Sequence, residues 1–314
     1  MERALGLEAA FESQVMAFMS LATGEAVVPG PVTIEALGPA PETIYSAARV
    51  TPDAGVVAKL VSVVERNPRR GLPLVVGVAA VLDPRTGMLA ALIDAGSLTT
   101  LRTAAASAVA AASLAPDSAR RLAVVGAGTQ GRAHAMAIAR ALPIRQVRIH
   151  SRTPERRREL AEDLGVDVAP AESIEEAVQG ADVVALCTHS ATPILLGEWV
   201  EPGAVVISVG SNMPDRREVD DTFLERAGRI VVDQRESAMA LGGPIIRALE
   251  LGLCREDQLV ELGKVLIGED PGRLDPAQVI FYNPVGIAVQ DAAAAWVALH
   301  RARELGVGQP LRMS

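Results

Sequence analysis

The sequence predicts an α/β protein that combines a Rossmann-type, doubly wound parallel sheet with an α+β domain formed by both ends of the chain. Two patterns support this prediction. From about residue 121 to 233, short apolar strands alternate with helical segments, which is typical of a parallel sheet covered on both faces. From residue 43 to 94, apolar runs follow one another with turns between them, which is typical of an antiparallel meander.

The first part of the chain is expected to open with an amphipathic helix over residues 4–22, where apolar residues recur at helical spacing before a cluster of glycines and prolines. The strands of the meander are expected at 44–50, 56–64, 74–82 and 88–93. A helix capped by Thr99 or Thr100 follows. Pro116 ends this helix and marks a domain boundary.

The middle of the chain carries the parallel sheet, with strands expected at 122–125, 147–151, 166–169, 183–187, 205–209 and 230–233. Residues 279–282 form a further apolar run, and an alanine-rich helix to about residue 305 is expected to return to the first domain. The predicted domains are therefore residues 1–115 with 287–314, and residues 116–286.

Composition limits the possible classes of function. The 314 residues carry a net charge of −8, which opposes a nucleic-acid partner. Cys187 and Cys254 are too few for a disulfide framework and lack metal-ligand spacing, so we expect buried thiols in a reducing compartment and no structural metal. The alanine-rich run 104–112 is too short to span a bilayer, and no signal-length apolar segment opens the chain. A cytoplasmic protein without a membrane partner is expected.

The turn after the first strand of the parallel sheet has the spacing of a dinucleotide-binding loop. Gly126 permits a tight turn, Gly128 lets the backbone approach a pyrophosphate, and Gly131 lets the next helix pack closely on the strand. The N-terminus of that helix presents unpaired N–H groups to the phosphates. The residues expected to bind the cofactor here are Gly126, Ala127, Gly128, Thr129, Gln130 and Gly131. The alternative is a glycine turn without a ligand.

The second strand ends at Ser151, Arg152 and Thr153, where an NAD site usually carries an acidic residue for the ribose hydroxyls. A carboxylate would repel a 2′-phosphate, whereas these side chains can hydrogen-bond it and neutralise it. We therefore predict NADP(H), with NAD(H) possible. The alternative is that Arg152 is a solvated base and that Thr153 only caps the helix starting at Pro154.

Two later strand ends complete the expected cofactor site. Thr188, Val209 and Gly210 lie where ligands bind in open α/β sheets, and we expect them to line the nicotinamide.

Three other polar residues are expected to take supporting places. His134 follows the phosphate loop by one turn and is interpreted as a packed or surface histidine. Asn283 is expected in the cleft, and Asp291 is expected to stabilise the N-terminus of the last helix. We assign no proton transfer to Asn283 or Asp291.

Several segments together resemble the ornithine cyclodeaminase/mu-crystallin family, over roughly residues 15–308. They are Lys59–Val63, Gly71–Pro73, Leu98–Ser107, Gly126–Gly131, Pro214–Glu218 and Val285–Asp291. The stretch Leu98–Ser107, directly before the dinucleotide loop, is the most diagnostic. The resemblance implies a substrate domain built from both chain ends, a Rossmann domain between them, an active site in the cleft, and homodimerisation through the substrate domain.

By match to the family motif, Lys59 and Arg102 would hold the carboxylate of a small substrate, and Thr103 joins the expected cofactor-binding residues. Elementary chemistry supports the first part, because a cation in an apolar setting is costly unless it is paired. The alternatives are an internal salt bridge for Arg102 and a surface position for Lys59.

Two positions depart from the cyclodeaminase pattern. Asn212 stands where cyclodeaminases carry an Asp, and an amide can orient an imine but cannot take its proton. Near Gly30 and Pro31, cyclodeaminases have a further carboxylate-binding Arg, for which Arg49 is a substitute or else a plain surface charge. The expected catalytic residues are Lys59, Arg102 and Asn212, with Arg49 as a further substrate-binding residue.

These departures favour an NADPH-dependent reductase of cyclic ketimine carboxylates, which yields a small amino acid. The alternatives are ornithine cyclodeaminase, which converts ornithine to proline and ammonia, an alanine dehydrogenase-like enzyme, and a ligand-binding protein regulated by NADPH. The expected partners are a small amino-acid or imino-acid substrate and a second copy of the chain.

Overall fold

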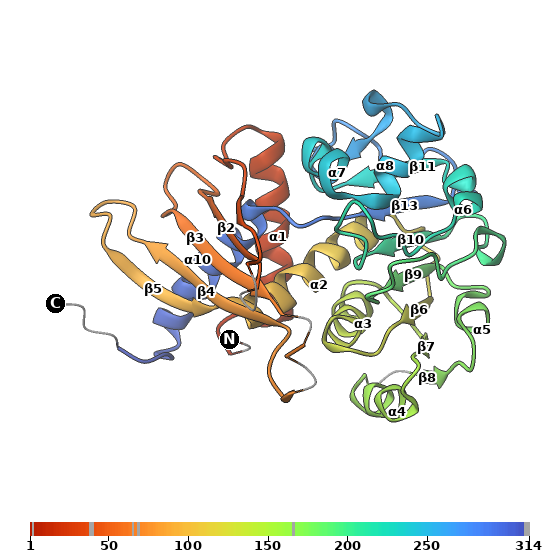
Figure 1. The fold of residues 1–314 in the computed structure, drawn as a ribbon, viewed down its shortest axis with the longest axis horizontal. Coiled ribbons are helices and arrows are strands. Elements are labelled where there is room, and N and C mark those ends of the chain that lie inside the picture. Colours follow the sequence, from red (N-terminus) through yellow and green to blue (C-terminus); the bar gives the residue numbers. More distant parts are fainter. Residues whose placement is uncertain (2, 38–40, 65, 68–69, 165–166, 311–314) are drawn as a thin grey trace. The chain divides into compact units, whose positions relative to one another are not determined.

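The computed structural model describes residues 1, 3–37, 41–64, 66–67, 70–164 and 167–310 (Figure 1). The chain divides into two compact units. The terminal unit comprises Met1–Arg102 and Ala288–Ser314, and the central unit comprises Thr103–Ile287. None of the helices in the described ranges combines the length and apolar character that a membrane span requires.

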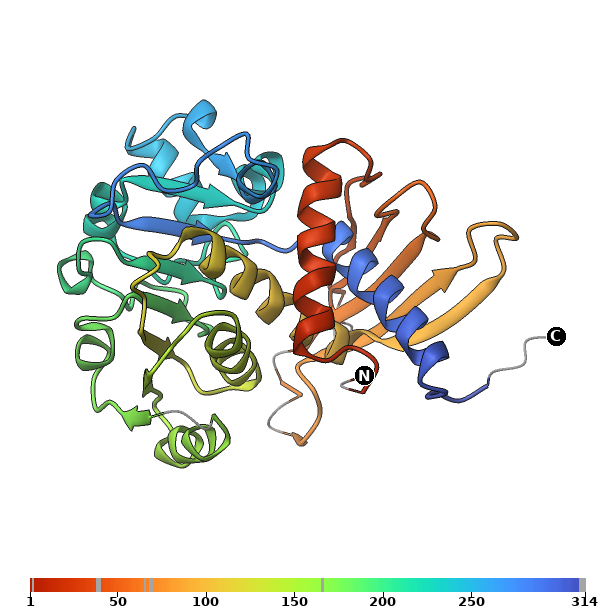
Figure 2. The ribbon, with the colours of Figure 1, turned by 180° about the vertical axis from the view of Figure 1, so that it is seen from behind.

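The terminal unit contains a five-stranded sheet whose strands follow one another in chain order. They are β1 (Val32–Ile34), β2 (Thr43–Ala48), β3 (Val57–Val63), β4 (Val75–Leu82) and β5 (Leu89–Asp94), and every neighbouring pair is antiparallel. The predicted meander is confirmed. Helix α1 (Leu7–Ala22) packs beside α10 (Ala288–Glu304), and α10 also contacts β2, β3 and β4 (Figure 2). The last helix thus returns to the first unit, as predicted.

Alternation along these strands separates two faces of the sheet. Ser46, Lys59, Ala79 and Ile93 are direct neighbours across β2 to β5, and Lys59 and Ala79 are buried. Since α10 packs on β2, β3 and β4, the buried row faces this helix. Lys59 therefore occupies a core position of the sheet.

Helix α2 (Ala95–Leu114) starts ahead of Thr99 and Thr100, the predicted caps. The physical reason is Asp94, the last residue of β5, whose carboxylate accepts a hydrogen bond of 2.7 Å from the Ser97 N–H. The second half of α2 belongs to the central unit, where the Leu114 carbonyl accepts a bond from Arg273. The two units therefore divide inside α2 and not at residue 116.

The central unit holds an eight-stranded sheet in the order β12-β11-β13-β10-β9-β6-β7-β8. Its strands are β6 (Arg121–Val125), β7 (Gln146–His150), β8 (Asp167–Pro170), β9 (Val183–Leu186), β10 (Val205–Ser208), β11 (Arg229–Val232), β12 (Val260–Glu261) and β13 (Ile280–Asn283). All neighbouring pairs are parallel. The predicted doubly wound sheet is confirmed, while Val166 of the strand expected at 166–169 lies outside the described residues.

Helices cover both faces of this sheet, with α3 and α4 on one side and α5 and α6 on the other (Figures 1 and 2). The helices of the central unit are α3 (Thr129–Ala141), α4 (Pro154–Asp163), α5 (Ile174–Val178), η2 (Gly197–Trp199), α6 (Asp221–Arg226), α7 (Arg235–Leu241), α8 (Gly243–Glu250), η3 (Glu256–Gln258) and α9 (Leu262–Leu266). Burial on both faces explains why β9 and β10 consist only of buried residues.

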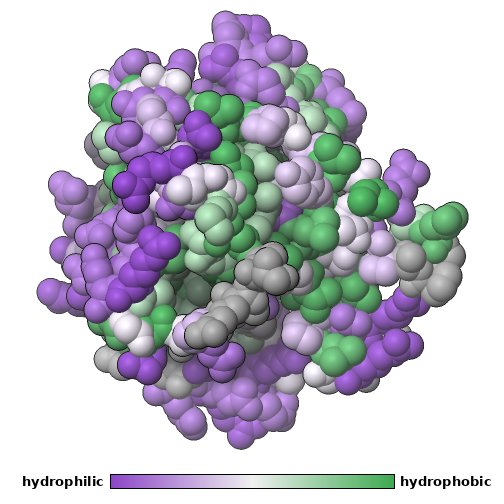
Figure 3. Space-filling model, turned by 90° about the vertical axis from the view of Figure 1, so that its left-hand side faces the viewer, coloured by the Kyte–Doolittle hydropathy of each residue, from purple (hydrophilic) through white to green (hydrophobic). Residues whose placement is uncertain are grey.

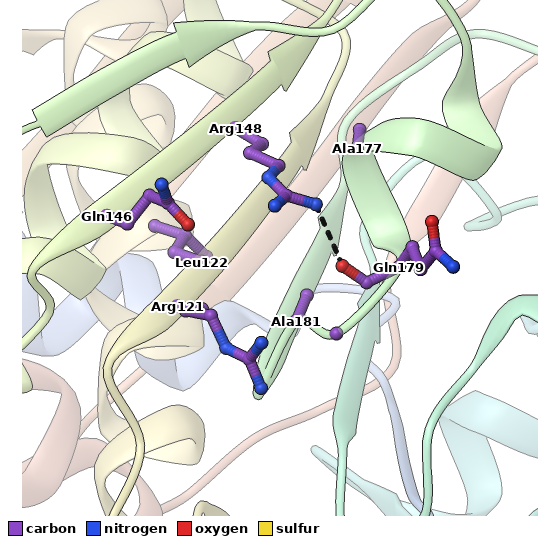
Figure 4. A pocket seen from close by; sticks show the side chains of 8 residues that line it. Arg121, Leu122, Gln146, Arg148, Ala177, Gln179 and Ala181 are labelled. Atoms are coloured by element: carbon purple, nitrogen blue, oxygen red, sulfur yellow. Dashed lines mark hydrogen bonds between the residues drawn. The ribbon is translucent and has the colours of Figure 1, made fainter.

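A small pocket lies where β6 and β7 begin, at the amino edge of the sheet (Figure 4). Arg148 lines it, but its guanidinium donates to the carbonyl groups of Glu176 and Gln179 at 3.0 and 2.9 Å. This arginine therefore satisfies the C-terminal end of α5. Ligands of parallel sheets bind at the opposite, carboxyl edge.

Candidate functional site

The glycine loop after β6 is shaped by close contacts within the protein. Gly126 has a φ of +100°, and a Cβ there would lie 2.5 Å from the Cys187 carbonyl oxygen. A Cβ at Gly131 would lie 1.7 Å from the carbonyl oxygen of Gly126. Only glycine fits these two positions.

Gly128 differs because nothing lies within 4 Å of the place its Cβ would occupy. It is the N-cap residue of α3, and no side chain caps the helix there. In the same loop Ala127 is buried, Thr129 is exposed and Gln130 is half-buried. Open space in front of uncapped N–H groups at the start of a 13-residue helix fits a pyrophosphate group.

Ser151, Arg152 and Thr153 follow β7, which pairs with β6, so this segment lies beside the glycine loop. Thr153 is the N-cap residue of α4, as predicted, but its side chain makes no capping hydrogen bond. Arg152 is exposed and forms no ion pair with any described residue. The Ser151 hydroxyl accepts a long hydrogen bond of 3.4 Å from the Thr153 N–H and keeps its own proton to donate, so these groups can bind a phosphate.

The carboxyl ends of β9 and β10 are joined by a buried carboxylate that we did not predict. Glu218 is completely buried, and its Oε1 accepts hydrogen bonds from the N–H and the hydroxyl of Thr188 at 2.8 and 2.7 Å. Its Oε2 accepts bonds from the hydroxyl of Ser208 and the N–H of Gly210 at 2.8 and 2.9 Å. Glu218 therefore fixes Thr188 and Gly210, two of the three residues expected at the nicotinamide. The third, Val209, is half-buried.

The terminal unit brings Lys59 and Arg102 together on one carboxylate. Lys59 Nζ forms an ion pair with Oδ2 of Asp291, and Arg102 Nε donates to Oδ1 of the same side chain at 3.1 Å. Arg102 Nη1 also donates to Oε1 of Gln290 at 3.0 Å, and the Gln290 carbonyl accepts a bond from buried Gln14 of α1. Elements from both ends of the chain thus build one buried polar cluster.

The charges in this cluster do not balance. Lys59, Arg102 and Asp291 are 7%, 8% and 3% exposed, so two cations share one anion out of bulk water. Burial lowers the pKa of Lys59, and this effect outweighs the charge of Asp291, which raises it, while the charge of Arg102 acts in the same direction as burial. Burial alone would raise the pKa of Asp291, but the charges of Lys59 and Arg102 hold it below its usual value. Among the described residues, the cluster carries one positive charge in excess.

Asp291 has a role that sequence reasoning did not predict. It lies in the first turn of the last helix, whose N-terminus it is expected to stabilise, and its carboxylate also binds the two cations. The available signal was its position among the buried alanines of α10, where an unpaired carboxylate would be costly.

The other predicted site residues differ in burial and belong to both units. Arg49 is exposed, with no ion pair to a described residue, and Asn212 is an exposed residue of the central unit. Thr103 is half-buried on α2. Asn283 is buried in the central unit, where its Nδ2 donates to the Ser208 carbonyl at 2.9 Å.

His134 is a packed histidine, which confirms one of the two interpretations given above. It is fully buried on α3, with Nδ1 2.7 Å from the Gln130 carbonyl oxygen and Nε2 2.9 Å from the Ser107 hydroxyl. Cys187 and Cys254, expected to be buried, are half-buried free thiols.

The central unit has a parallel sheet and a glycine loop that fits a pyrophosphate, and the terminal unit has a buried cationic cluster. Together these features define a class of dinucleotide-binding proteins that recognise small anions. Residues 45–306 match the ornithine cyclodeaminase/mu-crystallin family, and the chain belongs to this family. The predicted resemblance is confirmed.

Three similar proteins illustrate the membership. The ketimine reductase mu-crystallin of Mus musculus is 35% identical over 251 residues, which cover 80% of this chain and 76% of the mouse protein. The Thermococcus litoralis Delta(1)-pyrroline-2-carboxylate reductase, solved in complex with NADH and L-proline, superposes with a TM-score of 0.93 at 29% identity, covering 99% of this chain and 98% of that one. An archaeal alanine dehydrogenase dimer with bound NAD has a TM-score of 0.91 at 27% identity, covering 100% and 98%.

Proposed function

We propose that this chain is an NAD(P)H-dependent reductase that converts small cyclic ketimine carboxylates into amino acids such as proline or pipecolate. The observation that carries the proposal is the buried cluster of Lys59, Arg102 and Asp291, with its excess positive charge. A substrate carboxylate would balance that charge. The names of the mouse and Thermococcus litoralis relatives support a reaction at a carbon–nitrogen double bond.

Lys59 is suited to supply the proton that this reaction needs. The lowered pKa of Lys59 makes its ammonium group a stronger acid than an ordinary lysine, because burial disfavours the charged form. Asp291 keeps the ammonium in place through its ion pair. A bound reduced nicotinamide would supply the hydride to the imine carbon, and the imine nitrogen takes the proton, so that the amine and the oxidised cofactor result.

Asn212 favours the reductase over a cyclodeaminase. A cyclodeaminase must move protons to and from two amino groups, and an amide has no proton to exchange at neutral pH. Reduction of a preformed imine requires only one proton and one hydride.

We further propose a preference for NADP(H) over NAD(H). Arg152 and the uncommitted hydroxyl of Thr153 support it, because both can bind a 2′-phosphate and no carboxylate of this segment opposes it. The solved relatives named above contain NADH or NAD, so this chain would differ from them in its ribose contacts.

We also propose a homodimer formed through the open face of the terminal unit's sheet. Val32, Tyr45, Leu60 and Val78 are direct neighbours across β1 to β4 and are 37–56% exposed. Figure 3 views the side of the molecule where β5 lies in Figure 1 and shows hydrophobic residues gathered over a broad area. A contiguous apolar surface of this kind is typical of an interface, and the archaeal relative is described as a dimer.

A cytoplasmic location completes the proposal. The half-buried thiols of Cys187 and Cys254 are both free, which suits a reducing compartment.

Absorbance of NADPH, followed with a five- or six-membered cyclic ketimine carboxylate, tests the function. Arg102→Gln removes one of the two cations, and we expect kcat/KM to fall by about 100-fold or more, since a hydrogen bond to a charged group is lost in a buried site. Arg85→Gln, at an exposed arginine of the same unit, is the matched control and should leave the rate unchanged.

Two outcomes would contradict the proposal. An Arg102→Gln variant with the kcat/KM of the wild type would exclude carboxylate binding by the cluster. Wild-type protein that leaves the ketimines unreduced but releases ammonia from ornithine would establish the cyclodeaminase instead.

A further inference from the structure

We propose that the buried carboxylate of Glu218 is the counter-charge for the oxidised nicotinamide ring, and that it favours release of hydride from the reduced cofactor. The inference rests on the proposed cofactor and deepens the proposed function. It concerns a residue of the Pro214–Glu218 segment that has no other assigned role.

The position of Glu218 follows from the order of the strands. The phosphate loop and the ribose segment follow β6 and β7, which lie on one side of the point where the strand order reverses. A dinucleotide crosses such a point, so its nicotinamide half lies over the ends of β9 and β10 on the other side. Glu218 binds Thr188 and Gly210, the residues at those two ends.

Four hydrogen bonds converge on the carboxyl group of Glu218, and the two from backbone N–H groups favour its charged form. Each oxygen accepts two hydrogen bonds, one of them from a backbone N–H that can only donate. A proton on either oxygen would require the hydroxyl of Thr188 or Ser208 to turn and accept it. Burial raises the pKa of Glu218 above its usual value, and the four hydrogen bonds oppose this shift by stabilising the charged form.

This negative charge has no cation to balance it. No lysine, arginine or histidine of the described ranges forms an ion pair with Glu218, although it is fully buried. Buried charges are normally paired, because their desolvation is costly. A nicotinamide ring is neutral when reduced and carries one positive charge when oxidised, so only the oxidised ring supplies the missing partner.

A preference for the oxidised ring acts directly on hydride transfer. The ring becomes positive as the hydride leaves, and a fixed negative charge nearby stabilises that developing charge. The same charge makes the oxidised cofactor bind more tightly relative to the reduced one.

The test measures dissociation constants of oxidised and reduced cofactor for the full chain without imine substrate, by quenching of protein fluorescence. Glu218→Gln keeps the shape of the side chain and removes its charge. We expect this variant to lose affinity for the oxidised cofactor by about fivefold or more relative to its affinity for the reduced cofactor, because a partly screened charge pair is lost. Glu201→Gln, an exposed residue of the same unit, is the control and should leave the ratio unchanged.

A second measurement needs no variant. The NAD⁺ analogue that carries benzamide in place of nicotinamide has a neutral ring of the same shape, and wild-type protein should bind it at least about fivefold more weakly than NAD⁺. Equal affinities here, equal weakening of both redox forms by Glu218→Gln, or no cofactor binding at all would overturn the inference. A chain that shows the expected ratios without reducing imines would instead refute only the proposed reaction.

Discussion

Single residues carry unbalanced buried charges in both units. Two cations share Asp291 in the terminal unit, and Glu218 has no cationic partner among the described residues of the central unit. Charges of this kind destabilise a folded chain unless a ligand of opposite sign completes them. These two charges carry the ligands proposed above, an anion for the terminal unit and a cationic ring for the central unit.

His134 leads to a prediction about acid stability. Burial lowers the pKa of His134 to about 4 from the usual 6.5 of a histidine, so between these values the unfolded chain binds a proton that the folded chain does not. Stability from this group is complete above pH 6.5 and decreases as the pH falls toward 4. The free energy of unfolding of the wild type should differ between pH 7.5 and pH 4.5, and replacing His134 with Gln should reduce this difference by about 2–3 kcal/mol. Urea unfolding of both proteins at the two pH values measures it, and identical pH dependences would contradict it.

The sequence predicts the cations of the site better than its anions. Lys59 lies within an apolar strand and Arg102 within a run of alanines, so their costs of burial can be recognised without a structure. The partners of Asp291 and Glu218 cannot be recognised in the sequence, because they come from distant segments of the chain. Asp291 meets Lys59 only after the chain has returned from the central unit.

At the scale of elements, the junction between β5 and α2 depends on one carboxylate. Asp94 accepts the bond from the Ser97 N–H, and no other cap is needed for a helix that continues to Leu114. Asp94→Ala should destabilise the protein by about 1 kcal/mol. Asp94→Asn keeps the acceptor and serves as the control. Chemical denaturation measures the change, and an unchanged midpoint in Asp94→Ala would show that the helix start is fixed by packing alone.

Elements with a strong pattern are predicted correctly, and elements too short to carry a pattern are not. The strands β6, β9 and β10 are recognised because burial on both faces leaves continuous apolar runs. β12 has only two residues and carries no such pattern, so its place at the edge of the sheet depends on pairing with β11. The start of α2 was misplaced because threonine and aspartate both cap helices and the chain offers both.

At the scale of the whole molecule, the apolar sheet face leads to a prediction about assembly. Leu60→Glu places a charge in the middle of the proposed interface, where burial without a partner is costly, so the dimer should dissociate. Light scattering after size-exclusion chromatography measures the mass. Leu251→Glu is the matched control, since Leu251 is 39% exposed and Leu60 is 43% exposed. A wild-type monomer, or a Leu60→Glu dimer, would contradict the proposed interface.

The return of α10 to the terminal unit also sets the order in which the molecule can be completed during translation. Residues 1–102 leave the ribosome first, but the helix that covers their sheet and brings Asp291 to Lys59 and Arg102 follows the whole central unit. The central unit is continuous in sequence and can fold as soon as residue 287 has emerged. Until α10 is made, the sheet of the terminal segment lacks the helix that covers it, and Lys59 and Arg102 lack the carboxylate of Asp291.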